Sequence, residues 1–127
     1  MKIASAVARY LLGFIFFVFG LNGFLHFLPS PPPSGLAGQF VGAMFVSHYL
    51  SVVFAFELAA GILLLINRYV PLALVVLGAI IANIVLFHAF LAPSGLPLAL
   101  VVTVLWFIVA AGVRPAFNGL FQQRVTA

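Results

Sequence analysis

Long apolar runs, each bounded by helix breakers or charged residues, constrain this chain more than any other feature of its sequence. A membrane-crossing helix needs about 20 mostly apolar residues. Four runs meet this pattern, at about 10–28, 49–66, 70–91 and 96–113. Short connections between later runs favour antiparallel neighbours. We therefore predict an all-α fold, with residues 1–127 forming one integral membrane domain, a four-helix up-down-up-down bundle with an outer loop at 29–48.

Composition excludes the main alternatives to a membrane protein. The chain has 127 residues, of which 66% are hydrophobic and 5% charged, whereas soluble domains contain about 25% charged residues. A disulfide scaffold is excluded because the chain has no Cys. The net charge of +4 comes from five scattered basic residues, which form no patch for nucleic acid.

The basic residues predict the orientation, because cytoplasmic loops are enriched in Lys and Arg. All of them fall on one side of the four predicted spans: Lys2, Arg9, Arg68, Arg114 and Arg124. The opposite side, formed by the 29–48 loop and the 92–95 turn, has neither Lys nor Arg. We expect both termini to be cytoplasmic.

The outer loop starts with a proline-rich segment and becomes apolar again from Gln39 to Val46. This second part is too short to cross a membrane. We expect a short interfacial helix or a partly re-entrant lid over the outer mouth of the bundle.

Polar residues inside the apolar runs are the candidate site, because ionisable side chains in lipid are costly. At about 1.5 Å per residue from the outer ends of the runs, Asn22, Glu57 and Asn83 lie at similar depth in the outer half. His26 and His88 lie nearer the outer surface. We predict that these five residues bind a ligand in a cup that opens outward, since the inner half is apolar.

Helical spacing refines this prediction. Asn22 and His26 are four apart and should share one face of their helix. Asn83 and His88 are five apart and diverge by about 140°, so both cannot point straight at one spot.

Small residues in the runs predict close helix packing. The relevant residues are Gly13, Gly20, Gly23, Gly78 and Ala82.

Glu57 has both a structural and a functional interpretation. Asn22 and Asn83 could hold its carboxyl and set the helix register. However, hydrogen bonds in membranes average only about 0.6 kcal/mol, so an ionisable group contributes little to stability alone. Removal from water favours the neutral carboxyl, which donates hydrogen bonds or carries protons.

Two kinds of ligand suit these residues. A quinone needs hydrogen-bond donors for its carbonyl groups and an apolar slot for its ring and tail. The side chains available as walls are Phe24, Phe87 and Phe90. Alternatively, His26 and His88 could hold a haem iron, or join Glu57 at a metal. The sequence has no haem-attachment motif or His-rich cluster, so we predict no metal site and favour quinone over haem.

Four stretches of the chain resemble the DoxX-like family of small bacterial membrane proteins. They are LNGFLHFLP at 21–29, ELAAGILLL at 57–65, YVPLAL at 69–74 and NIVLFHAFL at 83–91. The last apolar run, at about 96–113, matches the family only as an apolar helix. His48 departs from the family pattern, which has a small residue before the tyrosine, so the resemblance supports no role for it.

The resemblance implies a four-helix, multi-pass protein of the bacterial inner membrane. Some relatives are associated with redox work, including thiosulfate-to-quinone oxidoreduction. Two functions stay open. In the first, the chain binds a lipophilic ligand such as a quinone and serves as a subunit or accessory of other membrane redox proteins rather than as a self-sufficient enzyme. In the second, it is a non-catalytic scaffold or assembly protein whose buried polar residues only fix helix packing.

Overall fold

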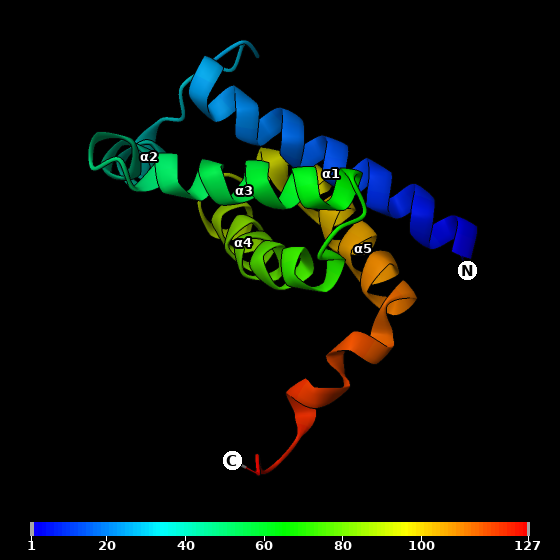
Figure 1. Ribbon diagram of the computed structural model, residues 1–127. Coiled ribbons are helices and arrows are strands. Elements are labelled where there is room, and N and C mark those ends of the chain that lie inside the picture. The colour runs from blue at the N-terminus through cyan, green and yellow to red at the C-terminus, as the bar shows by residue number, and fades with distance from the viewer. Residues whose placement is uncertain (1, 127) are drawn as a thin grey trace.

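The computed structural model describes residues 2–126, which contain helices and no strand. The α-helices are α1 (Lys2–Leu25), α2 (Gly35–Val46), α3 (Tyr49–Leu65), α4 (Val70–Phe90) and α5 (Leu96–Gly112) (Figure 1). Two 3₁₀ helices flank α5: η1 (Pro93–Gly95) and η2 (Arg114–Phe121). Helices suit such apolar runs because each backbone group is satisfied within its own segment, as lipid requires.

Helices α1, α2 and α3 are each followed, within two residues of their ends, by a residue in the left-handed conformation. His26, His48 and Asn67 have φ of 53°, 65° and 56°, a conformation that L-residues rarely adopt. Prolines near the first positions of α4 and α5 mark new starts, since proline there loses no helical hydrogen bond. These breaks divide the apolar sequence into separate helices.

Three helical segments are long and apolar enough to cross a membrane: α1, α4, and the segment Pro93–Gly112 that joins η1 to α5. With 17 residues, α3 is shorter. It forms a fourth candidate span only together with α2, from which it is bent by 83°. The chain is thus an all-helical protein with three to four candidate spans, which indicates a multi-pass membrane protein.

Helix α1 and the first predicted span, at about 10–28, have different bounds. The helix begins at Lys2 rather than near residue 10, and it ends at Leu25, three residues before the predicted end. The chain leaves the helix at His26, whose backbone is left-handed, before it reaches residue 28. The other three runs each extend one residue beyond α3, α4 and α5.

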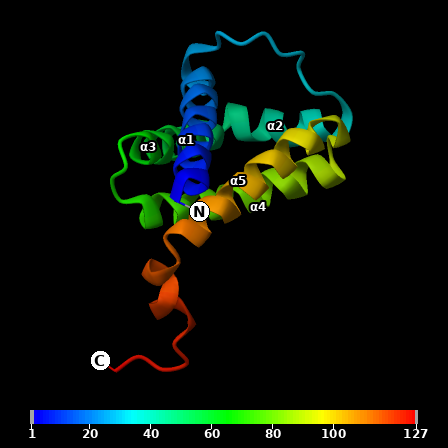
Figure 2. The same cartoon turned by 90° about the vertical axis from the view of Figure 1, so that its right-hand side faces the viewer.

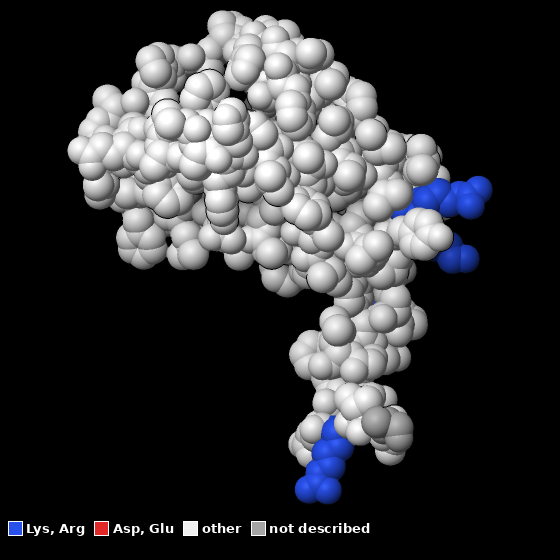
Figure 3. All heavy atoms as spheres, turned by 60° about the vertical axis from the view of Figure 1, so that its left-hand side comes forward, with Lys and Arg blue, Asp and Glu red and all other residues white. Residues whose placement is uncertain are grey.

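The surface of the protein is mostly uncharged. Figure 3 shows Lys and Arg at one end of the helical body and on the C-terminal extension, with white atoms between. Large apolar side chains cover the helices, among them Phe14, Leu86 and Phe107, each more than half exposed. Such a surface is favourable against lipid and costly against water.

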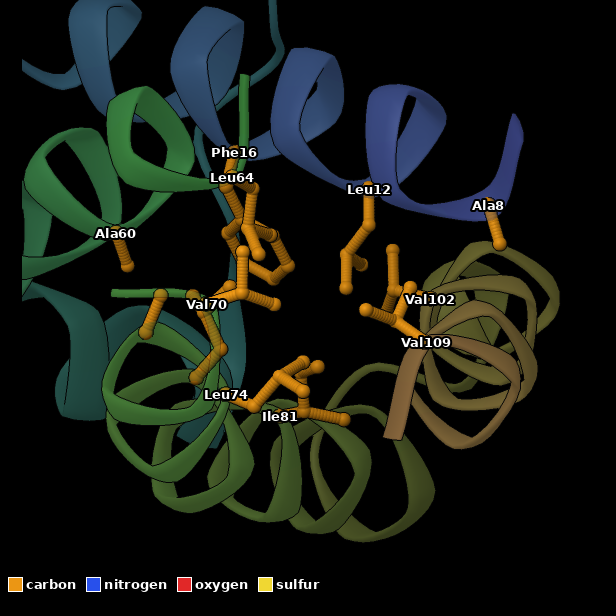
Figure 4. Packing of buried hydrophobic residues seen from close by; sticks show 12 residues of the cluster. Ala8, Leu12, Phe16, Ala60, Leu64, Val70, Leu74, Ile81, Val102 and Val109 are labelled. Atoms are coloured by element: carbon orange, nitrogen blue, oxygen red, sulfur yellow. The ribbon is translucent and has the colours of Figure 1, made fainter. Parts of the chain in front are cut away.

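Each long helix has two long neighbours. Helix α1 contacts α3 and α5, and α4 also contacts α3 and α5, while α2 packs against α3 (Figures 1 and 2). The buried side chains point into the space between the four long helices (Figure 4). Leu12, Leu64, Leu74 and Leu77 are fully buried there. This core holds the walls of the candidate site in place.

Helices α1 and α3 approach closely because glycines line their contact. A Cβ atom on Gly20 would lie 2.7 Å from the Leu58 backbone nitrogen, and one on Gly61 would lie 2.6 Å from the Phe17 nitrogen. Both distances are shorter than real Cβ atoms show. The predicted close packing at Gly20 is confirmed.

Candidate functional site

Glu57 lies on the buried side of α3 and is the one acidic residue of the chain. Its side chain is only 6% exposed. Its Oε2 atom is buried and has no hydrogen-bond partner among residues 2–126. Buried polar atoms in proteins are nearly always paired, so such an atom indicates a function or an absent partner.

Glu57 lines a cavity of about 210 Å³ between the four long helices. The other walls are apolar, apart from His88 of α4. They include Phe16 and Phe19 of α1, and Ala99 and Val102 of α5. A carboxyl in this cavity therefore has few polar neighbours.

On its other side, Glu57 lines a larger cleft of about 610 Å³ between α2, α3 and α4. Asn83 and His88 also line this cleft. Phe40 of α2 lies over it, with its ring centroid 5.8 Å from that of Phe87. The predicted short helix in the outer loop therefore exists as α2, and it forms one wall of the site.

Four residues line both hollows and stand where they meet: Phe54, Glu57, Ile84 and His88. Two of these are the ionisable side chains of the site. A ligand in either hollow would thus meet Glu57 and His88 together.

His88 is held in one orientation. Its Nδ1 lies 3.1 Å from the Ala92 carbonyl oxygen. A carbonyl only accepts, so Nδ1 carries the proton, and Nε2 of the neutral ring is left as an acceptor. Gly95 packs so closely on the ring that an added Cβ would overlap it. The site therefore combines a carboxyl with an oriented imidazole ring.

Asn22 and His26 lie elsewhere, and neither lines the two hollows. The Asn22 carbonyl accepts from the His26 N–H at 2.8 Å, and its side-chain oxygen accepts from the Leu28 N–H at 2.7 Å. The prediction that His26 shares a helix face with Asn22 was wrong, because His26 lies beyond the end of α1. Instead, both hydrogen bonds to Asn22 lie at the C-terminal end of α1, where the chain leaves the helix.

Asn83 lines the larger cleft, but its side-chain amide forms a hydrogen bond within its own helix. Its Nδ2 donates to the Ala79 carbonyl at 2.8 Å. Since Asn22 bonds to Leu28, neither asparagine holds the Glu57 carboxyl. Two of the five predicted residues, Glu57 and His88, thus share both hollows, and Asn83 shares one.

The wall residues were predicted in part. Phe87 and Phe90 line the larger cleft, whereas Phe24 lines neither hollow. Phe40 and Phe54 were missed. Phe54 lies three residues before Glu57 and thus on the same helix face, which was a usable signal.

The described residues contain no group of three or more His, Cys, Asp or Glu side chains that could hold a metal ion. Glu57 and His88 are the two ionisable side chains that line both hollows.

Comparison of the chain with models of known protein families, with curated proteins and with solved structures finds no match. A function for the chain therefore has to rest on its own residues.

Proposed function

We propose that this chain is a DoxX-like protein of the bacterial inner membrane that binds a lipophilic ligand such as a quinone beside Glu57. In this proposal it serves membrane redox chemistry as a subunit or accessory of other membrane proteins. One observation carries the proposal: a buried carboxyl oxygen without a partner among the described residues, on the wall of two adjoining hollows.

The free energy lost by leaving that oxygen without a hydrogen bond supports the binding of a ligand there. Leaving a buried polar group unpaired costs about 1–3 kcal/mol, and more if the group is charged. A hydrogen-bonding ligand beside Glu57 would recover this free energy on binding. The site is then less stable empty than filled, as expected of a binding site.

The larger cleft fits a ligand of this class. Its volume of about 610 Å³ lies within the range of about 300–1,000 Å³ that is usual for small-molecule sites. Aromatic and aliphatic side chains form its walls, and polar groups are few. A neutral Glu57 carboxyl would donate to a carbonyl oxygen, and His88 Nε2 would accept from a hydroxyl. Those are the oxygen groups of a quinone and its reduced form.

The proposed membrane arrangement is an up-down-up-down bundle of α1, α3, α4 and α5 with both termini in the cytoplasm. Two observations support it. Each of these helices packs against two others of the set, and all five Lys and Arg residues lie on the same side of the predicted spans. Helix α2 would then cover the outer mouth, next to the cleft.

The scaffold alternative needs Glu57 to hold helices together through hydrogen bonds. The asparagines that would serve as its partners bond to Leu28 and Ala79 instead. Ligand binding therefore accounts for Glu57 better than helix register does.

The test is to replace Glu57 by Leu and to measure binding and stability together. In detergent, decylubiquinone at 100 times its Kd should stabilise the unsubstituted protein by about 2.7 kcal/mol, seen as a rise in Tm. Glu57→Leu should abolish this rise and leave the Tm without ligand unchanged or higher, because an unpaired polar atom is removed. Thr103→Val is the matched control, since Thr103 lines neither hollow and bonds to the Ala99 carbonyl.

Two results would contradict the proposal. One is an unsubstituted protein whose Tm does not respond to decylubiquinone. The other is a Glu57→Leu variant that loses stability but keeps its response to the ligand, which is the behaviour expected of a scaffold.

A further inference from the structure

A third hollow lies at the opposite end of the molecule from the α2 wall (Figure 1). It has a volume of about 500 Å³ and is formed by the start of α1, the turn before α4 and the end of α5. Three basic side chains line it, namely Lys2, Arg9 and Arg114. No acidic side chain does, since Glu57, the single Asp or Glu of the chain, lines the other hollows.

The three charges come together through helix geometry. Lys2, Ser5, Ala6 and Arg9 follow the spacing of one helix face, so α1 presents two cations and a hydroxyl to the hollow. Arg114 arrives from the other side, at the start of η2. Gly112 lets α5 approach α1 here, because an added Cβ would overlap the Ser5 hydroxyl.

Arg9 is held in a fixed position. Its guanidinium donates to the Leu64 carbonyl at the end of α3 and lies 4.3 Å from the centre of the Tyr10 ring. A guanidinium has five N–H donors, so others remain for a ligand. The side chain is half-buried, so its attraction for a negative group in the hollow is screened less than at an open surface.

The rest of the hollow is apolar. Val70, Val109 and Val113 form its deeper wall, and Asn67 adds an amide at the rim. A ligand that fits must therefore carry a negative group beside an apolar portion. This combination distinguishes a phospholipid from a free inorganic anion.

We propose that this hollow, with Lys2, Arg9 and Arg114 on its wall, binds the phosphate headgroup of an anionic membrane lipid. Glu57, the one acidic side chain of the sequence, lines the other hollows, so among residues 2–126 no acidic side chain shares this hollow with the three cations. Basic pockets between membrane helices on the cytoplasmic side recognise such headgroups, and five of the six charged residues of the chain are basic. The lipid would tie α1 to α5 at the end of the molecule away from Glu57.

The test uses the full chain in a neutral detergent, with bound lipid counted by native mass spectrometry. Phosphatidylglycerol should bind in preference to phosphatidylcholine. Each of Lys2→Gln and Arg114→Gln should weaken phosphatidylglycerol binding about fivefold, the effect of one basic residue near an anionic lipid surface. Arg114→Lys should restore most of the affinity.

Arg68→Gln and Arg124→Gln are the matched controls, because each removes one positive charge on the same side of the spans without touching the hollow. Both should change the Kd less than twofold. An equal loss in the controls would show diffuse attraction and overturn the proposed site. Displacement of phosphatidylglycerol by inorganic phosphate at millimolar concentration would overturn the assignment to a lipid. Arg9 is left intact because its bond to α3 also supports the fold.

Discussion

Replacement of Gly20 by Ala should separate α1 from α3 and disturb the site beside them. The added Cβ would lie 2.7 Å from the Leu58 nitrogen and 2.9 Å from the Leu58 Cα. Non-bonded carbons normally lie about 3.5 Å or more apart, so the helices must move apart by several tenths of an ångström. These are backbone atoms, and no rotation of a side chain can relieve the overlap.

The expected magnitude follows from two opposing effects. Extra atoms in a well-packed core cost about 1–3 kcal/mol, while Gly→Ala in a helix gains about 1 kcal/mol from propensity. Gly42→Ala in α2 is the matched control, since nothing lies within 4 Å of its added Cβ. Comparing the two variants cancels the propensity effect, so Gly20→Ala should be less stable than Gly42→Ala by about 1–3 kcal/mol.

The assay is reversible unfolding of the full chain in mixed micelles with increasing dodecyl sulfate, followed by circular dichroism. Leu58 adjoins Glu57, so the separation should also widen the cavity beside Phe16 and weaken decylubiquinone binding. Equal free energies of unfolding for the two alanine variants would refute the close packing of α1 on α3 at this point.

Two further predictions follow from the end of α1 and from the membrane arrangement. Asn22→Ala should cost about 0.5–1.5 kcal/mol, the usual value of one hydrogen bond, and leave decylubiquinone binding within twofold in a Tm-shift titration; a loss as large as that of Glu57→Leu would place Asn22 in the site. Because the chain has no Cys, single-cysteine variants report the orientation directly. Ser34→Cys should react with a membrane-impermeant maleimide added outside intact cells, and Asn118→Cys should react only after lysis. The reverse pattern would overturn the proposed orientation.

The site could be predicted only in part. The periodicity of apolar residues shows neither where a helix ends nor which group a polar side chain bonds to. Depth was counted from residue 28, the outer end of the first predicted run, yet α1 ends at Leu25, and Asn22 lines neither hollow. Asn22 and Asn83 were expected to bond to Glu57, but nearer backbone groups compete for them. Glu57 itself was identified correctly as a buried residue, since a single ionisable group in an apolar run is visible in any sequence.

Length and hydropathy alone determined that this chain is helical and rich in candidate membrane spans, because apolar runs of such length have few other ways to satisfy their backbone. They also placed the starts of α3, α4 and α5 at residues 49, 70 and 96, the last two with a proline at the first turn. Only the tertiary structure brought α2 over the cleft, placed His88 beside the hollows of Glu57 and gathered three distant cations at the other end. Those arrangements depend on which helices touch, and that is decided by glycine contacts and side-chain packing between segments far apart in the sequence.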